Sequence, residues 1–544
     1  MKQPFRTIIV TGGIVSGIGK GITAASLGRL LINRGFSVTP VKADPYLNQD
    51  AGTMNPFQHG EVFVTEDGAE TDLDLGHYER FLNINLSKLA NFTSGAVYRS
   101  VMEQEREGEY LGKTIQIIPH VTDEIKRRVI QAATETKADF LTVEIGGTVG
   151  DIEALPFIEA LRQFREMHRS DTAVVHVVKV DYLYPSDESK TKPIQHAVAT
   201  LRGYGLQPDM LVVRCKRALE RDAIEKIALF TGVLPENIIA AEDADSLYAI
   251  PEAMEKAGFA TAVLKHFALE SPPVKPSAAQ WHAMCQREAS PKGRVKVGMV
   301  GKYIQHSDAY LSVIESIKHA GIYQQLDPEI VPIDAEASDV AQQVAACDAL
   351  IVPGGFGSRG IEGKIKAIQT AREQKIPFLG ICLGLQLAVI EYARSVLGLT
   401  GANSTEFDEK TAHPLIAFLP GQESIRQKGG TMRLGTYPAR LSAGSLAEEL
   451  YKKYRPSEIK KGIIAERHRH RYEVNPEYQE RLQKGGLVIS GVLPERELVE
   501  FIELSPEVHP YFIATQAHPE FRSRPEEPHP LFAGLIGATQ QKKV

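Results

Sequence analysis

Cys382 stands between two glycines, in the order Gly380-Ile381-Cys382-Leu383-Gly384, and follows an apolar stretch that begins at Ile376. Glycines two places before and after a cysteine permit a sharp strand-to-helix turn, which lifts the sulfur off the strand end. The sulfur then faces the positive N-terminal end of the next helix, where a thiolate is stabilised. The pattern indicates a cysteine nucleophile, and a buried core cysteine is the alternative that it leaves open.

A cysteine nucleophile needs a base and a group that orients the base, and His518-Pro519-Glu520 can supply both. If this segment is extended, the side chains of His518 and Glu520 point the same way, so that Glu520 can hold the imidazole. The loop Pro353-Gly354-Gly355-Phe356-Gly357 follows another predicted strand and can present N–H groups to an oxyanion. Together these features predict acyl transfer through a thioester, although His518 is far from Cys382 in sequence.

The N-terminal end indicates phosphate chemistry. A glycine-rich loop, Thr11 to Gly21, lies between a strand predicted at 6–10 and a helix predicted over about 22–33. Its N–H groups can cradle phosphates, and Lys20 can reach the outer ones. Gly21 stands where a magnesium-binding Ser or Thr is usual, so we expect the metal to be held elsewhere. A glycine-rich turn without phosphate is the alternative.

Glu144 is the first candidate for that metal site. It lies near the carboxyl end of an apolar strand predicted at 140–147, where open α/β sheets place their ligands. An unpaired carboxylate would be unfavourable to bury there, whereas Mg²⁺ binds one or two carboxylates together with nucleotide phosphates. Asp74 or Asp72, from the acidic stretch 61–74, is expected as the second ligand. A salt-bridged core carboxylate is the alternative for Glu144.

Two basic stretches are ambiguous on their residues alone. Lys190-Thr191-Lys192 precedes a predicted helix and suits a phosphate group, but on the residues alone a solvated loop is the favoured interpretation. The run Arg467 to Arg471 favours a solvated strip or a nucleic-acid patch.

Composition limits the class of protein. The chain has 544 residues, a net charge of −6, 43% hydrophobic residues and four cysteines. These values are typical of a globular protein with no overall attraction to nucleic acid. The cysteines form no CxxC pair, which suits a reducing compartment, and no apolar stretch reaches the ~20 residues of a membrane-spanning helix. We expect a cytoplasmic protein that binds neither nucleic acid nor membrane.

The remaining pattern predicts two doubly wound, mostly parallel-sheet α/β domains. Strands predicted at 37–42, 172–180, 210–215 and 237–241 alternate with helical stretches in the first half. A proline-rich connector follows at 270–277, and new strands are predicted at 295–301, 349–352 and 511–516. We therefore place the domains at 1–270 and 294–544, with a linker at 271–293.

The motifs of both halves resemble known families. The elbow with Gln386, the glycine loop 353–357 and His518-Pro519-Glu520 resemble class I glutamine amidotransferases, which hydrolyse glutamine and hand ammonia to a partner domain. The segments that resemble the CTP synthase family are 12–21, 58–64, 67–74, 144–153, 190–193 and 467–475. This resemblance covers nearly the whole chain. It implies an N-terminal P-loop-like synthetase, or amidoligase, domain and a C-terminal class I glutaminase domain.

The resemblance also implies site residues. Cys382, His518 and Glu520 are implied to be catalytic, and Asp74 and Glu144 to hold Mg²⁺ with ATP. Those implied for ATP are Gly17, Ile18, Gly19, Lys20, Gly21, Ile22, Asp74, Glu242, Asp243 and Ala244. Those implied for UTP or CTP are Ser16, Asp151, Ile152, Glu153, Lys190, Thr191, Lys192, Pro193, Ile194, Gln195 and Lys226. Those implied for L-glutamine are Gly355, Leu383, Gly384, Leu385, Gln386, Glu406 and Arg471, the last by clamping the α-carboxylate.

The implied reaction is the ATP-dependent amination of UTP to CTP. ATP phosphorylates the C4 oxygen, and ammonia from glutamine attacks C4 of the 4-phospho-UTP. The family likeness also implies an ammonia passage lined by His59 and Val62, and activation by GTP near Arg359, Gly360, Glu362 and the loop 429–435. It further implies inhibition by CTP and a homotetramer.

Two other interpretations stay open. One is another ATP-dependent glutamine amidotransferase, of the cobyrinic-acid or dethiobiotin-like amidoligase type. The segments 151–153 and 190–192 argue against it, because they favour a pyrimidine nucleotide as the substrate. The other is a non-enzymatic filament scaffold, which the intact Cys382, His518, Glu520, Lys20 and Glu144 argue against.

Overall fold

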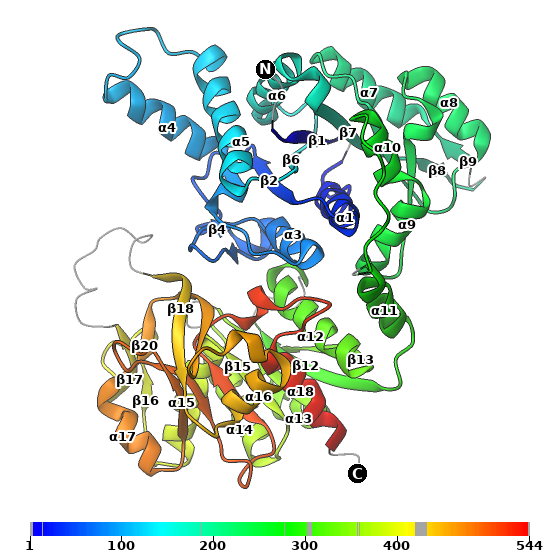
Figure 1. Cartoon of the computed structure of the whole chain (residues 1–544). Coiled ribbons are helices and arrows are strands. Elements are labelled where there is room, and N and C mark those ends of the chain that lie inside the picture. The colour runs from blue at the N-terminus through cyan, green and yellow to red at the C-terminus, as the bar shows by residue number, and fades with distance from the viewer. Residues whose placement is uncertain are drawn as a thin grey trace. The chain divides into compact units, whose positions relative to one another are not determined.

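The computed structural model describes residues 4–13, 15–185, 188–276, 278–301, 307–355, 357, 359–418 and 432–541 (Figure 1). Packing divides the chain into two compact units: Met1–Thr53 with Asp74–Cys285, and Met54–Leu73 with Gln286–Val544. The segment Met54–Leu73 therefore packs with the C-terminal unit, although it belongs by sequence to the N-terminal half. The domain boundaries at 270 and 294 stay predictions.

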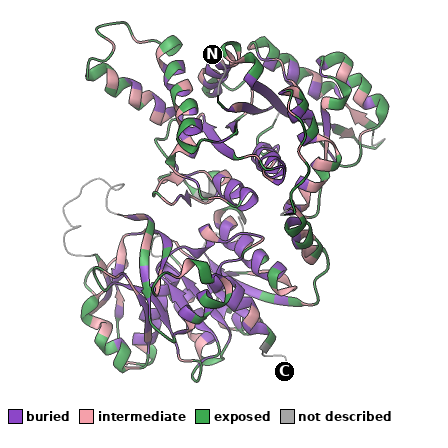
Figure 2. Cartoon of the chain, in the orientation of Figure 1, coloured by how far each residue is buried: buried purple, intermediate pink, exposed green. Residues whose placement is uncertain are grey.

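A parallel sheet forms the centre of the first unit. Its strands are β1 (Arg6–Gly12), β2 (Val38–Asp44), β5 (Asn91–Thr93), β6 (Phe140–Ile145), β7 (Thr172–Lys179), β10 (Met210–Cys215) and β11 (Ile238–Glu242). They lie in the order β11-β10-β7-β1-β6-β2-β5, and every described neighbouring pair is parallel. β2 and β6 are buried throughout, because helices cover both faces of the sheet (Figure 2).

Helices occupy the connections between the strands of this unit, as the predicted doubly wound pattern requires. They are α1 (Lys20–Asn33), α3 (Asp74–Leu82), α4 (Ser94–Arg106), α5 (Thr122–Thr136), α6 (Leu155–Met167), α7 (Lys192–Gly203) and α8 (Arg221–Thr231), and α9 (Ile250–Lys256) and α10 (Phe259–His266) follow the last strand. Apolar residues of α4, α5 and α6 form one core cluster with β2 and β6. A short hairpin joins β8 (Asp181–Leu183) to β9 (Glu188–Lys190). α11 (Ala278–Ala289) crosses the division between the units at Cys285.

The second unit contains a larger, mixed sheet. Its strands are β12 (Arg294–Gly301), β13 (Asp327–Asp334), β14 (Ala349–Val352), β15 (Phe378–Ile381), β18 (Arg433–Leu441), β19 (Ile463–His470), β21 (Val488–Val492), β22 (Val499–Glu503) and β23 (Phe512–Thr515). The order is β13-β12-β14-β15-β23-β22-β21-β18-β19. The strands from β13 to β23 are parallel, whereas β22, β21, β18 and β19 extend the sheet antiparallel. The predicted α/β class is confirmed, with an antiparallel arm added.

Two core clusters cover the opposite faces of this sheet. One involves α13 (Val340–Ala345), α14 (Ile361–Glu373), α15 (Leu383–Ser395) and α17 (Pro476–Lys484), and the other α12 (Leu311–Gln324), α16 (Leu446–Tyr454) and α18 (Pro530–Gln541). The smaller elements are α2 (Pro56–His59), the hairpin β3 (Phe63–Val64) with β4 (Glu70–Thr71), and a sheet of β16 (Ala402–Ser404), β17 (His413–Phe418) and β20 (Tyr472–Val474). No helix in the described part of the chain has the length and apolarity to cross a membrane.

Candidate functional site

Three neighbouring strands bring the motifs of the second unit together. β15 lies between β14 and β23, with Val352 opposite Gly380 and Ile381 opposite Thr515. All three strands are parallel, so the glycine loop after β14, the elbow after β15 and the His518 segment after β23 meet at one edge of the sheet.

The predicted sharp turn is present at Cys382. This residue has a positive φ of 52° and a ψ of −100°, and its N–H donates to Thr515 O at 2.7 Å. A Cβ on Gly384 would stand 2.1 Å from Val352 O, and one on Gly380 would stand 2.8 Å from the backbone of Gly384. The two glycines are therefore required by close backbone approach, and the strained turn is held by the packing around it.

His518 and Glu520 form a buried ion pair beside the elbow, with 2.7 Å between Nδ1 and Oε1. Burial lowers the pKa of His518, but the charges of Glu520 and Cys382 outweigh it and raise that pKa to about 10. The Cβ position that Gly354 leaves empty lies 2.8 Å from His518 Cε1 and 3.6 Å from Cys382 Cβ. The loop glycine thus allows the imidazole and the cysteine to approach.

The reason given from sequence for the pairing of His518 with Glu520 is wrong. We expected an extended segment, but Pro519–Arg522 forms a 3₁₀ turn, η9. Pro519 is at its start, where a proline is tolerated because the first N–H groups of a helix have no acceptor. The carboxylate still reaches the imidazole because the turn folds Glu520 back toward it.

The residues expected from the sequence to bind glutamine lie at the start of α15 and in loops of the second unit. Leu383, Gly384, Leu385 and Gln386 form the first turn of α15. Glu406 accepts from Gly357 N at 3.3 Å, and burial raises its pKa while Gly357 and the charge of Arg471 partly offset that effect. A carboxylate and a guanidinium near one another suit the ammonium and carboxylate groups of an amino acid. Phe356, in the predicted oxyanion loop, lies outside the described residues.

The basic run at 467–471 is not a solvated strip. Arg467, His468 and His470 lie buried in β19. Arg467 Nη1 donates to Val64 O at 3.0 Å, and Arg469 pairs with Glu70 at 2.7 Å. These residues therefore bind the segment Met54–Leu73 to the sheet that carries Cys382. His59 ends α2, and Val62 precedes β3, in that same segment.

The glycine loop of the first unit turns sharply from β1 into α1. Gly17 and Gly19 have positive φ values of 70° and 101°, and Lys20 is the first residue of the helix. Lys20 Nζ donates to Gly147 O at 2.7 Å, and burial lowers its pKa. This strand, loop, lysine and helix have the arrangement of a phosphate cradle.

Asp74 and Glu144 form a carboxylate pair next to this loop. Lys42 Nζ bonds both, at 2.8 Å from Glu144 Oε1. Burial raises the pKa of Asp74, but the charges of Lys42 and His77 outweigh it and lower that pKa to about 2. Burial raises the pKa of Glu144 despite Lys42.

The pair fits a magnesium site. Two carboxylates that face one cation are the hard-oxygen donors that Mg²⁺ takes beside phosphates. No cluster of three or more metal-binding side chains occurs in the part of the chain that the structure describes. A Cβ on Gly21 would approach Asp74 Oδ1 to 2.2 Å, so Asp74 occupies the space where the usual hydroxyl side chain would lie.

Most of the other residues expected to bind nucleotides lie in loops and at element ends of the first unit. Ile18 precedes α1 and Ile22 lies within it, while Ser16 is exposed in the loop. Thr148 N donates to Asp151 Oδ2 at 2.9 Å, ahead of η3 (Ile152–Ala154), in which Ile152 and Glu153 are exposed. The remaining positions are Lys190 in β9, Thr191 to Gln195 at the start of α7, Lys226 in α8, and Glu242 to Ala244 at the end of β11.

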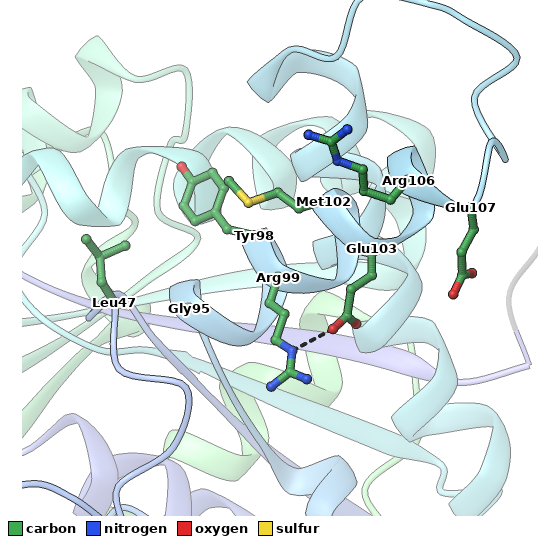
Figure 3. A pocket seen from close by; sticks show the side chains of 8 residues that line it. All are labelled: Leu47, Gly95, Tyr98, Arg99, Met102, Glu103, Arg106 and Glu107. Atoms are coloured by element: carbon green, nitrogen blue, oxygen red, sulfur yellow. Dashed lines mark hydrogen bonds and ion pairs between the residues drawn. The ribbon is translucent and has the colours of Figure 1, made fainter. Parts of the chain in front are cut away.

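The described residues also line two hollows, one in each unit. One of about 410 Å³ in the second unit is lined by Gly360 and Glu362, beside the pair of Arg359 with Glu336. The loop at 429–431 lies outside the described residues. The other hollow, of about 510 Å³, lies along α4 and is lined by Leu47, Gly95, Tyr98, Arg99, Met102, Glu103, Arg106 and Glu107 (Figure 3).

Sequence reasoning missed three residues at these sites: Lys42, Tyr78 and Gln516. Lys42 carries a charge within the fully buried strand β2, which is a signal that the sequence did contain. Tyr78 donates to Glu144 from α3, and Gln516 Nε2 donates to Cys382 Sγ at 3.6 Å. Neither contact has a local sequence signal, because each joins segments far apart in the chain.

Comparison with known proteins identifies both halves. Residues 6–269 match the family described as CTP synthase N-terminus, and residues 305–538 match glutamine amidotransferase class-I. The CTP synthase of Caldanaerobacter subterraneus subsp. tengcongensis is 53% identical over 541 residues, 99% of this chain and 98% of the relative. That of Bacillus subtilis is 50% identical over 536 residues, 98% of each.

A solved structure, described as the Trypanosoma brucei CTPS glutaminase domain with bound acivicin, is also similar. It is 38% identical, with a TM-score of 0.41, and the likeness covers 45% of this chain and 94% of that one. Because relatives match at about half identity along almost the entire length, the chain belongs to the CTP synthase family.

Proposed function

We propose that the protein aminates UTP to CTP with ATP and with ammonia that it releases from glutamine at Cys382. One observation carries the glutaminase part: Cys382, at a strained elbow, lies beside a buried His518–Glu520 ion pair at the ends of adjacent strands. Membership of the CTP synthase family supports the product.

In the glutaminase step, the Cys382 thiolate attacks the side-chain amide carbon of glutamine and a C–S bond forms. His518 gives its proton to the departing nitrogen, so that ammonia leaves, and Glu520 keeps the ring oriented. Water then gives a proton to His518 and cleaves the thioester to glutamate. The loop at Gly355 and the start of α15 supply N–H groups to the oxyanion.

Substrate glutamine is held by its charged ends. Arg471 clamps the α-carboxylate, and Glu406 accepts the α-ammonium. Gly355 and residues 383–386 form the rest of the pocket. Burial of Glu406 and its position near Arg471 support this assignment.

In the synthetase step, the glycine loop and Lys20 bind the ATP phosphates, and the C4 oxygen of UTP takes the γ-phosphoryl group while ADP leaves. Ammonia attacks C4 of the 4-phospho-UTP, and phosphate departs. Mg²⁺, when bound, neutralises charge on the phosphates, and Asp74 and Glu144 would hold it. The positive charge of Lys42 partly neutralises the negative charges of these two carboxylates.

The remaining assignments rest on the family likeness. Ser16, the segments 151–153 and 190–195 and Lys226 contact UTP or inhibitory CTP, and residues 242–244 contact ATP. Ammonia passes along His59 and Val62, whose segment continues directly into Asp74. GTP activates glutamine hydrolysis near the hollow at Gly360 and Glu362.

We also propose a cytoplasmic homotetramer. The exposed Leu47 and Met102 at the hollow along α4 support association of copies, since large apolar side chains are rarely left together in water (Figure 3). The four free cysteines agree with a reducing compartment.

One assay tests the whole assignment: CTP formation from UTP and ATP, first with glutamine and then with ammonium. We expect activity with both nitrogen sources, and Cys382→Ala should abolish only the glutamine-dependent rate. Loss of both rates in a folded variant would contradict two separate sites. No turnover of UTP with either source would favour a different amidoligase or a scaffold.

A further inference from the structure

Gln516 is a buried amide directly beside the sulfur of Cys382. It follows β23, is 0% exposed, and its Nε2 lies 3.6 Å from Sγ. Its backbone N–H donates to Glu500 O at 2.9 Å, so its main chain is held in place on the neighbouring strand. The backbone of Gln516 is therefore anchored by a hydrogen bond of its own, apart from those of the side-chain amide.

The orientation of this amide follows from its neighbours. Gln386 Nε2 donates to Tyr472 O at 3.1 Å, and a backbone carbonyl can only accept. The same Nε2 lies 3.3 Å from Gln516 Oε1, which must therefore be an acceptor. Its other end, the NH₂ group, consequently points at Cys382 Sγ, and the chain Tyr472–Gln386–Gln516 aims a donor at the sulfur.

We infer that Gln516 stabilises the Cys382 thiolate by donating a hydrogen bond to it, as a further catalytic residue of the glutaminase site. A hydrogen bond to a charged acceptor is stronger than one to a neutral group, and burial strengthens it again. The donor favours the thiolate over the thiol, in addition to the charge of the His518 imidazolium and without taking part in the proton transfer. This inference rests on the proposed role of Cys382 as nucleophile.

A purely structural role is the competing explanation, in which Gln516 only holds Gln386. Two substitutions probe this position. Gln516→Met retains the unbranched shape and removes both the donor and the acceptor. A structural role predicts that Gln516→Met leaves the pH profile of Cys382 alkylation unchanged, whereas thiolate stabilisation predicts that the profile shifts. Gln516→Glu retains the acceptor for Gln386, but its carboxylate repels a thiolate under either explanation, so the decision rests on Gln516→Met.

The experiment measures the rate of alkylation by iodoacetamide as a function of pH, followed by mass spectrometry of the Cys382 peptide in the full-length protein. The thiolate displaces iodide, and a C–S bond forms. Gln483→Leu, on the exposed face of α17, is the matched control for loss of a glutamine amide. Cys382→Ala reports alkylation of the other cysteines.

We expect Gln516→Met to slow alkylation of Cys382 about tenfold at neutral pH. The midpoint of the pH dependence of alkylation should rise by about one pH unit, which corresponds to loss of one charged hydrogen bond. Gln516→Glu should move it further. CTP formation from ammonium should persist in both, which checks the fold. If either variant loses that activity, Gln516→Asn, whose shorter side chain places its donor away from Sγ, takes its place with the same expected shift.

An unchanged alkylation profile in variants that still use ammonium would overturn the inference and leave Gln516 as a support for Gln386. That result is distinguishable from failure of the proposed function. In the latter case, Cys382→Ala would retain glutamine-dependent activity, whatever the behaviour of Gln516.

Discussion

Replacing Glu520 by glutamine tests whether its charge holds His518 as an imidazolium beside the thiolate. The two side chains form a buried pair with 2.7 Å between Nδ1 and Oε1. The Glu520→Gln substitution would keep the size and one acceptor but remove the charge. We expect glutamine hydrolysis at neutral pH to fall by between about a hundredfold and a thousandfold.

The magnitude follows from the balance at His518. Burial lowers the pKa of His518, and the charges of Glu520 and Cys382 outweigh it and raise the pKa to about 10. Two unit charges about 4 Å apart attract by about 4 kcal/mol at an effective dielectric constant of 20, or roughly three pKa units. Without Glu520 the pKa of His518 returns to roughly 7, and the ion pair with the thiolate loses up to about a thousandfold in population.

The assay is glutamate release from glutamine in the presence of UTP, ATP and Mg²⁺, between about pH 6 and pH 9. CTP formation from ammonium serves as the internal control, because His518 and Glu520 take no part in it. A raised pKa also contributes stability that is present below the ordinary pKa of 6.5 and is lost as pH rises through about 10. The difference in free energy of unfolding between the unsubstituted protein and Glu520→Gln should therefore shrink as pH rises from about 6.5 to about 10.

Two results would refute this reasoning. The first is an unchanged rate and pH profile of glutamine hydrolysis in Glu520→Gln. The second is an equal loss of the ammonium-dependent rate, which would indicate damage to the fold rather than to the charge at His518.

Three further predictions follow from close contacts and from one shifted carboxyl. Gly21→Ser should reduce CTP formation about a hundredfold with either nitrogen source but leave glutamine hydrolysis unchanged. The reason is that its Cβ would stand 2.2 Å from Asp74 Oδ1 and displace that carboxylate. Equal loss of CTP formation and glutamine hydrolysis would contradict this prediction. Gly384→Ala should lower the free energy of unfolding by about 1 to 3 kcal/mol in urea titrations, because its Cβ would stand 2.1 Å from Val352 O, and wild-type stability would refute it. Burial raises the pKa of Asp74, but the charges of Lys42 and His77 outweigh it and lower that pKa to about 2. Asp74→Asn should therefore lower the free energy of unfolding by about 2 kcal/mol near neutral pH, and this difference should disappear as pH falls from about 4 toward 2. A difference that grows on acidification would contradict the assignment.

Local features of the site were predictable because their cause is local. The glycines beside Cys382 predict the elbow, because close backbone approach requires glycine there. Gly17 and Gly19 predict the loop before α1, because positive φ values favour glycine. The absence of a hydroxyl at Gly21 directed attention to carboxylates elsewhere in the chain. The structure adds the reason, which is the carboxylate of Asp74 in that space.

Features that join distant segments were not predictable in the same way. The extended geometry assumed for His518 and Glu520 was wrong, because a 3₁₀ turn is compatible with the same Pro519. Lys42 was visible as a charge in a buried strand, yet its two partners lie 32 and 102 residues away. The amide of Gln516 had no signal, since its orientation depends on Gln386 and a backbone carbonyl.

The sequence by itself determined the local parts: a cysteine at a strand-to-helix turn, a glycine-rich loop with a lysine, and a doubly wound pattern in each half. Only the tertiary structure decided which parts meet. Strand order places β14, β15 and β23 side by side, so that residues 136 positions apart share one site. It also packs Met54–Leu73 with the C-terminal unit. The physical reason is that sheet order and packing depend on the burial of many apolar side chains together, whereas a turn depends on a few backbone angles.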